Sequence, residues 1–286
     1  MSFGSVESLL RAAESVPVWE AVLLDDLSDR GVEREASWEK MAGLWRAMEE
    51  SVASYDPERR SACGLTGGDG AKVEHAQIGL CGPVLTAVMA TALKVGECNA
   101  CMGRIVAAPT AGASGVLPAV LLPMKEKYNF SDDDMVQALY VSAGFGQVIA
   151  TRASIAGAEG GCQAEVGSAS AMAAAALVAL LGGTPEQMAW ACATALQNLM
   201  GLVCDPVAGL VEVPCIKRNG GGVMCALCAA DMALAGIRSV IPVDEVVSAM
   251  REVGESLPCA LRETAQGGLA ATPTGQALAR KIFGAG

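Results

Sequence analysis

The sequence predicts an all-α protein. No segment alternates polar and apolar residues over a useful length, and apolar residues recur instead at helical spacing between Gly- and Pro-rich breaks. Ala and Gly are abundant, whereas aromatic residues make up only 4% of the chain. Small side chains let helices approach closely. We therefore expect a compact helical protein in which several Gly-rich loops gather in one region.

The helices are expected in a regular series along the chain. Residues 1–56 are rich in charge, and Met41, Leu44, Trp45 and Met48 recur at a spacing of three and four, which gives one apolar stripe. These N-terminal helices are expected to pack on the body of the protein. Further helices are expected at 83–95, 116–127, 132–150, 185–200, 223–238 and 243–256.

Two helix starts have clear capping signals. Ser131 is followed three residues later by Asp134, and Thr184-Pro185 is followed by Gln187, so each start resembles a capping box. Between the helices lie Gly-rich stretches that predict loops. They are GLTGGDG at 64–70, APTAGASG at 108–115, and a longer region at 201–222 that contains CDP, VPC and NGGG.

The chain reads as a single domain over residues 1–286. It has no internal repeat and no Pro/Ser-rich linker, so we divide it only into the N-terminal helices at 1–56 and a core at 57–286.

The charge and hydropathy argue against two classes of partner. A net charge of −11 disfavours nucleic acid and an anionic membrane surface. The longest apolar run, Ala171 to Leu181, is shorter than the ~18–20 residues that a membrane-spanning helix requires. The N-terminal residues carry acidic side chains and do not resemble a signal peptide. The expected location is the cytoplasm.

Eleven cysteines, an odd number, do not predict a disulfide framework in a chain of this length. Cys162, Cys204 and Cys215 each stand beside Gly or Pro at a loop or helix edge, where there is room for a bulky inorganic group. Their spacings of 42 and 11 residues are not those of a ferredoxin, so three structural thiols remain an alternative by spacing alone. The two Cys-x-x-Cys pairs, Cys98/Cys101 and Cys225/Cys228, are expected to be buried thiols rather than a zinc site.

Longer motifs around these cysteines resemble a known family. GCQAEVGSASAMAAA, GGTPEQ and GLVCDPVAGLVEVPCIKRN are similar to the iron–sulfur-dependent L-serine dehydratases, as are SACGLTGGD, APTAGASGVLP and ALRETAQGGLAATPTG. The resemblance extends from about residue 60 to the end of the chain. It implies a largely helical catalytic domain and a [4Fe–4S] cluster held by Cys162, Cys204 and Cys215.

The resemblance is closest to the separate alpha chain of the two-chain type. The single-chain forms carry a Ser-Ser-Ser-His-Thr type motif that this sequence lacks, so a beta chain is implied as partner. Some single-chain members also end in a cysteine that reaches the fourth iron, whereas this sequence ends IFGAG. The implied reaction is the conversion of L-serine to pyruvate and ammonia, with an open iron of the cluster as Lewis acid.

The base that removes the α-proton is the least determined role. His75, the only histidine, is expected to be structural, Lys72 is the candidate base if it is desolvated, and the partner chain could supply the base instead. Ordinary turn chemistry or structural roles remain alternatives for the substrate-binding candidates. These candidates, chosen for their places in the Gly-rich loops or beside Cys215, are Thr66, Asp69, Thr110, Ser114, Arg218 and Asn219.

Three other functions remain open. A pyridoxal-phosphate dehydratase could use NGGG at 219–222 as a phosphate cradle and Lys72 as the Schiff-base lysine, although no strand precedes the glycines. A cysteine desulfidase of the same cluster family would expel sulfide instead of water. A non-enzymatic iron–sulfur carrier would bind a cluster and release no ammonia from amino acids.

Overall fold

The computed structural model describes residues 3–77 and 79–284. Within these ranges the chain is helical, and its only β-type pairing is an isolated bridge between Cys204 and Arg262. The all-α prediction is confirmed. The α-helices are α1 (Val6–Ala12), α2 (Val18–Arg30), α3 (Arg34–Ala53), α4 (Asp69–Glu74), α5 (Gly82–Ala100), α6 (Val116–Tyr128), α7 (Asp132–Arg152), α8 (Gly157–Gly160), α9 (Ser168–Leu180), α10 (Pro185–Leu199), α11 (Cys215–Leu234), α12 (Val243–Ser256) and α13 (Pro273–Phe283).

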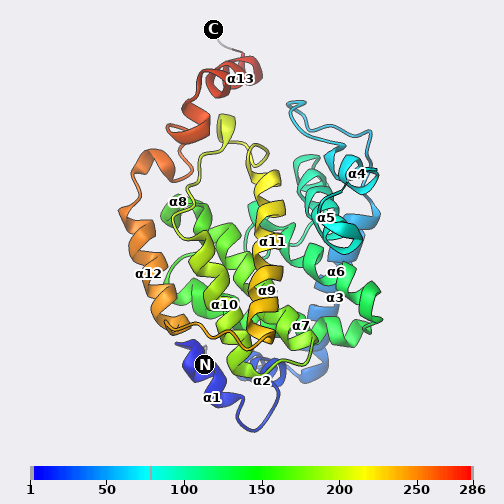
Figure 1. Ribbon diagram of the computed structural model, residues 1–286, viewed down its shortest axis with the longest axis vertical. Coiled ribbons are helices and arrows are strands. Elements are labelled where there is room, and N and C mark those ends of the chain that lie inside the picture. Colours follow the sequence, from blue (N-terminus) through cyan, green and yellow to red (C-terminus); the bar gives the residue numbers. More distant parts are fainter. Residues whose placement is uncertain (1–2, 78, 285–286) are drawn as a thin grey trace.

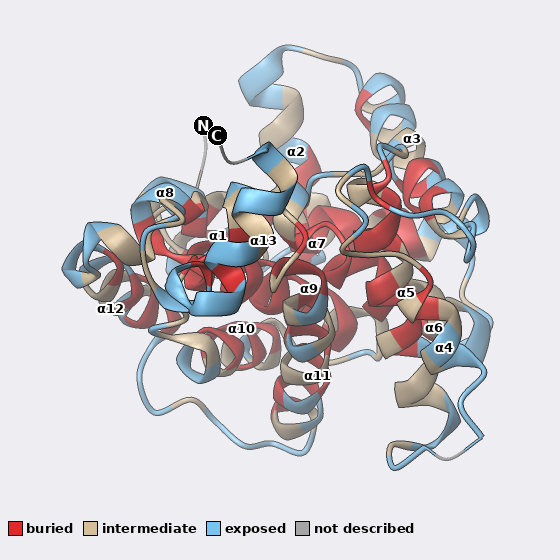
Figure 2. Cartoon of the chain, turned by 90° about the horizontal axis from the view of Figure 1, so that it is seen from above, coloured by how far each residue is buried: buried red, intermediate tan, exposed pale blue. Residues whose placement is uncertain are grey.

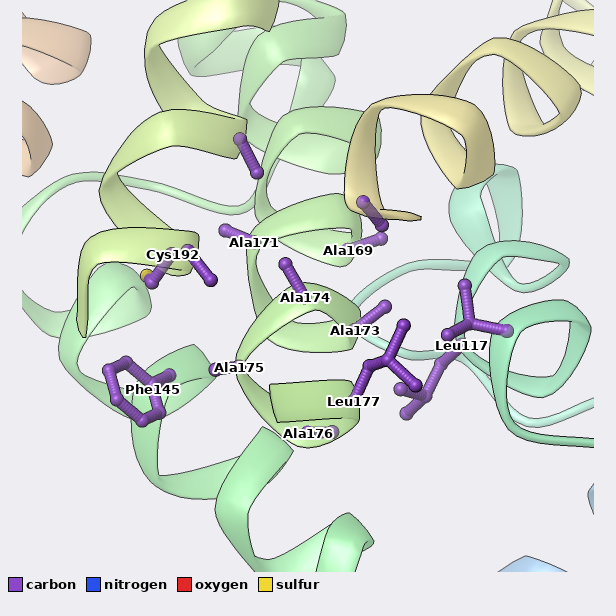
Figure 3. Close-up of a cluster of buried hydrophobic side chains, with 14 of the residues drawn as sticks. Leu117, Phe145, Ala169, Ala171, Ala173, Ala174, Ala175, Ala176, Leu177 and Cys192 are labelled. Atoms are coloured by element: carbon purple, nitrogen blue, oxygen red, sulfur yellow. The ribbon is translucent and has the colours of Figure 1, made fainter. Parts of the chain in front are cut away.

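Helix α9 forms the centre of the core and packs against α6, α7, α10 and α11 (Figure 1). All of its residues from Ser168 to Val178 are buried. Alanine is the strongest helix former, and its single methyl group lets neighbouring helices approach closely. Figure 3 shows these alanines turned toward Leu117, Phe145 and Cys192 on the surrounding helices. The core is therefore built from many short side chains.

One stretch, Gln163–Leu180, is long and apolar enough to cross a membrane by length and composition alone. It is 83% buried inside the protein. Burial against the other helices accounts for its apolar character, as in the core helix of a globular fold.

The N-terminal helices α2 and α3 pack on α7. Trp38 packs between Trp19, in an edge-to-face arrangement, and Tyr140, at a tilt, with ring centroids 5.9 and 6.0 Å away. The buried Ser37 hydroxyl forms hydrogen bonds with Asp26 at 2.5 Å and with the Tyr140 hydroxyl at 2.7 Å. Aromatic contacts and a satisfied polar group join these helices to the body.

The two predicted capping boxes are both present. Ser131 Oγ accepts from the Asp134 amide at 3.2 Å, and Asp134 Oδ2 accepts from the Ser131 amide at 2.8 Å. Thr184 and Gln187 exchange the equivalent bonds at 3.3 and 2.8 Å. Since each pair satisfies two otherwise unpaired amides, α7 and α10 begin where the sequence predicts.

The loop predicted at 201–222 is wrong in its last part. Helix α11 begins at Cys215, so the NGGG segment is helical and offers no glycine loop for a phosphate. A Cβ on Gly222 would lie 2.7 Å from Val166 Cγ1 and 2.9 Å from Ser170 Oγ. This glycine therefore serves the close approach of α11 to the core. Similarly, α4 begins at Asp69, inside the predicted 64–70 loop.

The two ends of the chain lie at opposite ends of the molecule (Figure 1). Helix α1 is at one end, and α13 is at the other, where it packs on the short 3-10 turns η3 (Val207–Gly209) and η5 (Gly268–Ala271). Viewed from above, buried stretches of α7, α9 and α10 occupy the middle, while α13 is largely exposed (Figure 2).

Candidate functional site

Three buried free thiols come from three separate segments. Cys162 precedes a π-helical turn, η2 (Gln163–Gly167), Cys204 lies in the loop after α10, and Cys215 is the first residue of α11. Their side chains are free thiols, and the residues are only 2%, 3% and 8% exposed. The placement at loop and helix edges agrees with the sequence analysis.

The three thiols are close enough to influence one another electrostatically. Burial raises the pKa of Cys162 to about 11, and the Glu165 carboxylate adds to the shift. Burial raises the pKa of Cys215 to about 12, and Cys162 adds to it. The pKa of Cys204 is also raised, first by burial and then by Glu165 and Cys162. Burial and the neighbouring negative groups therefore favour the protonated form of all three thiols.

Arg218 connects the three cysteine-bearing segments. Its guanidinium donates to the Val203 carbonyl at 2.8 Å and pairs with Asp205 Oδ1 at 2.8 Å, on either side of Cys204. It also hydrogen-bonds Cys162 and thereby opposes the rise in the pKa of that thiol. Because Arg218 lies one helical turn after Cys215, a single side chain fixes the segments relative to one another.

The π-helical turn after Cys162 brings a carboxylate into the same place. Glu165 Oε2 lies 3.6 Å from Cys204 Sγ, and Glu165 Oε1 accepts from the Thr110 hydroxyl at 2.8 Å. A Cβ on Gly157 would lie 2.6 Å from this carboxylate, so glycine is required at that contact. Burial raises the pKa of Glu165 above its usual value, although the bond from Thr110 opposes the rise. π-Helical turns are frequent at functional sites.

The 108–115 loop lies beside the cysteines. In addition to the bond from Thr110 to Glu165, the buried Asn219 side chain accepts from the Gly115 amide at 3.0 Å and donates to the Gly112 and Cys215 carbonyls at 2.7 and 2.9 Å. Asn219 thus joins this loop to α11. Ser114 Oγ is buried and has no hydrogen-bond partner among the described residues. Substrate binding by these residues stays a prediction.

The 64–70 loop approaches the site through Thr66. Its hydroxyl donates to Glu212 Oε2 at 2.8 Å, and Glu212 lies three residues before Cys215. Arg218 and Asn219 therefore lie directly among the cysteine segments, whereas Thr66 reaches them through Glu212.

Asp69 and Lys72 face a different part of the surface. Lys72 Nζ pairs with Asp69 Oδ1 at 2.8 Å, and the lysine side chain is 73% exposed. Both residues line a groove of about 540 Å³ between α4, α5 and α11, and none of the three cysteines lines it. A lysine that acts as a base needs a buried environment, and the described residues leave Lys72 exposed. The catalytic role of Lys72 stays a prediction.

Several groups of the site were not predicted from the sequence. Glu165, Asp205 and Glu212 are charged residues in segments that otherwise indicate loop or core. Their only signal is their place in the motifs around Cys162, Cys204 and Cys215. Their partners lie 13 to 151 residues away.

The other cysteines do not gather in the same way. Cys98 and Cys101 are buried as predicted, but Cys225 is half-buried and Cys228 is exposed, so the prediction for the second pair is wrong. That face of α11 points to solvent. Among the described residues, no group of three or more His, Cys, Asp or Glu side chains is arranged to hold a single metal ion.

Comparison with known proteins agrees with the resemblance seen in the motifs. The family model of the serine dehydratase alpha chain matches residues 13–270. The chain belongs to the serine dehydratase alpha-chain family.

Individual relatives share long stretches with this chain. The probable L-serine dehydratase alpha chain of Bacillus subtilis is 53% identical over 254 residues, which cover 88% of this chain and 85% of the relative. The L-serine dehydratase alpha chain of Peptoniphilus asaccharolyticus is 55% identical over 212 residues, 73% of each. L-serine dehydratase 1 of Escherichia coli is 45% identical over 181 residues, which are 63% of this chain but 40% of the relative.

Proposed function

We propose that this chain is the cluster-bearing subunit of an L-serine dehydratase, which converts L-serine to pyruvate and ammonia. The convergence of three buried thiols around Arg218 carries the proposal. Membership of the alpha-chain family and the names of the relatives support it.

The three thiols suit a [4Fe–4S] cluster as resident cofactor. They come from turns at helix edges and are protected from water, and their mutual repulsion as thiolates would be relieved by the positive charge of iron. A single ion requires ligands gathered around one point, whereas a cluster accepts thiolates at separate irons. A cluster held by three thiolates supplies one open iron, a Lewis acid that eases the departure of the serine hydroxyl.

The residues of the chain itself hold and orient this site. Arg218 holds the Cys162, Cys204 and Cys215 segments in fixed positions relative to one another. Thr110 and Ser114 are proposed to contact the polar groups of serine from the 108–115 loop, which Glu165 and Asn219 keep in place. The burial of the cysteines keeps water away from the reacting groups.

A second chain is proposed as partner. The relatives that match most of this chain are named alpha chains, and the relatives named simply L-serine dehydratase match over only 40% of their length. The remaining part of those longer proteins lies outside their alignment with this chain. We infer that a beta chain supplies the equivalent part, and a beta chain that covers Lys72 would provide the burial which a base needs.

The decisive experiment is anaerobic co-purification with the beta chain, followed by an assay of pyruvate from L-serine. Pyruvate and ammonia in equal amounts, together with broad cluster absorbance, are expected. Sulfide release from cysteine without pyruvate from serine would favour a desulfidase. Cluster transfer to an acceptor protein without ammonia release would favour a carrier. Activity lost on treatment with hydroxylamine would favour pyridoxal phosphate.

A further inference from the structure

Glu212 is a buried carboxylate in the segment between Cys204 and Cys215. It is 8% exposed and accepts three hydrogen bonds from one short loop. The donors are Ser61 Oγ at 2.7 Å, Cys63 Sγ at 3.1 Å and Thr66 Oγ1 at 2.8 Å. Three side chains of the SACGLT segment thus converge on a group three residues before a proposed cluster ligand.

The charge of Glu212 is balanced by these donors alone. In the described part of the chain, no Lys, Arg or His forms an ion pair with it. A buried carboxylate without a cation depends on its hydrogen bonds, and each lost bond leaves a desolvated group behind. These three hydrogen bonds therefore hold residues 61–66 firmly against Glu212.

A second buried carboxylate holds the other end of the same loop. Glu97 accepts from the Asp69 amide at 2.7 Å and the Gly70 amide at 3.2 Å, and Tyr55 donates to it at 2.7 Å. Between the two anchors, Gly67 and Gly68 adopt left-handed φ angles of 133° and 80°. A Cβ on Gly67 would lie 2.2 Å from the Arg59 carbonyl, so the loop has little room to change shape.

We propose that Glu212 is a positioning residue that couples the Cys215 segment to the loop presenting Thr66 to the substrate. This inference rests on the proposed function and on the sequence prediction that Thr66 binds the substrate. An ionised carboxylate can only accept, so Thr66 Oγ1 gives its single proton to Glu212 and keeps only acceptor capacity. Thr66 therefore contacts the ammonium group of serine rather than its carboxylate.

The test compares Glu212→Gln, Thr66→Val and the double variant in the complex of both chains. Gln at 212 retains one acceptor oxygen and turns an NH2 group toward the donors. We expect the KM for serine to rise about tenfold in each single variant, as for the loss of one or two hydrogen bonds in a binding loop, with kcat changed less. Cluster absorbance per chain should stay at the wild-type level.

The double variant distinguishes positioning from a general loss of stability. If Glu212 acts through Thr66, the double variant should show a KM within about threefold of either single variant. Independent effects would multiply to about a hundredfold and would overturn the proposal. A KM for Glu212→Gln within about twofold of wild type would also overturn it.

Amide hydrogen exchange gives a readout that does not depend on activity. In Glu212→Gln, the peptide covering residues 61–68 should exchange faster, whereas the peptide covering 108–115 should not change. Unchanged exchange at 61–68 would refute the coupling even if serine turned out not to be the substrate. Wild-type protein without activity on serine would instead count against the proposed function alone.

Two further variants complete the experiment. Glu58→Gln is the matched control, because Glu58 is exposed on the neighbouring segment, and it should leave the KM and the exchange unchanged. Ser61→Ala removes one of the three bonds and carries the same test if Glu212→Gln loses its cluster. It should raise the KM about threefold and show no additional effect in combination with Thr66→Val.

Discussion

The alanine-lined core around α9 and the cysteine site are both buried, but they are built from opposite kinds of residue. Around α9 the core consists mainly of short apolar side chains that need no partner, and Cys192 lies among them (Figure 3). The site buries thiols, carboxylates and an arginine that depend on one another. Burial of apolar side chains stabilises the α9 core. At the cysteine site, burial of polar and charged groups costs free energy because they lose contact with water. Such a cost is typical of a site kept for its chemistry.

The largest difference between the regions should appear when cysteines are removed. Replacing Cys162, Cys204 or Cys215 by alanine should abolish cluster absorbance and lower serine turnover at least about a hundredfold, because a proposed ligand of the catalytic group is lost. Cys192→Ala, which removes a thiol at least as deeply buried, should leave both unchanged. Absorbance spectra and the pyruvate assay measure these effects. A cluster retained in all three site variants would contradict the ligand assignment.

Exposure to air should inactivate the cysteine site without unfolding the α9 core, and no mutation is needed. In the proposed cluster, an iron that lacks a thiolate is expected to be released on oxidation, so turnover should fall while the helical circular dichroism of the core persists. Ferrous iron with a reductant should restore turnover if the three thiols are the cluster's ligands, because they would still hold the other three irons. Full activity after days in air without added iron would disprove this expectation.

Two adjacent glycines of α11 test how tightly the core side is packed. Gly222→Ala should destabilise the fold by about 1–3 kcal/mol, because its Cβ would meet Val166 and Ser170. Gly221→Ala should be neutral or stabilising by up to about 1 kcal/mol, since nothing lies within contact of its Cβ and alanine favours helix. Thermal unfolding of the two variants measures the contrast, and equal melting temperatures would break it.

The smallest effect concerns the ionisation of Cys192. Burial raises the pKa of this thiol, and Asp244 adds to the shift. Above the ordinary thiol pKa the unfolded chain loses the proton while the folded chain retains it, so the wild type loses stability as the pH rises. Between pH ~7.5 and ~10 this loss should reach about 1–2 kcal/mol. Cys192→Ala lacks it, so the stability advantage of the wild type over the variant should narrow by that amount.

The sequence predicted most of the helices, because capping and periodicity are local signals. Thr184 with Gln187 and Ser131 with Asp134 each specify a helix start within four residues. The NGGG segment does not form the expected loop: glycines indicate a loop unless a neighbouring segment requires the space, and Val166, which packs against Gly222, lies 56 residues before it. Local patterns cannot reveal such a contact.

The candidate site was predictable only where sequence motifs resembled a family. The sequence places the three cysteines beside Gly or Pro and within those motifs, and in the structure they lie close enough to influence one another electrostatically. Their role as cluster ligands stays a prediction. Glu165 and Glu212 were missed because their roles depend on Thr110 and Ser61, which lie far away in the chain. The sequence indicates Lys72 only by its place after the GGDG loop, whereas its exposure depends on how α4 packs on α5.

The π-helical turn at η2 has a consequence for the register of the protein. An α-helix advances about 100° per residue, and the π turn accommodates one extra residue between Cys162 and the start of α9. A π turn closes its hydrogen bonds five residues back instead of four, so it takes up the extra residue while Cys162 and the alanine face of α9 keep their relative orientation. Deleting one residue of this turn would convert it to ordinary α-helix and leave that orientation nearly unchanged. The loss would fall on the turn itself, where Glu165 contacts Thr110 and Cys204. The extra residue thus bulges a carboxylate toward the thiols without moving the packing surface, and homologous chains that keep this contact should keep the length of the turn.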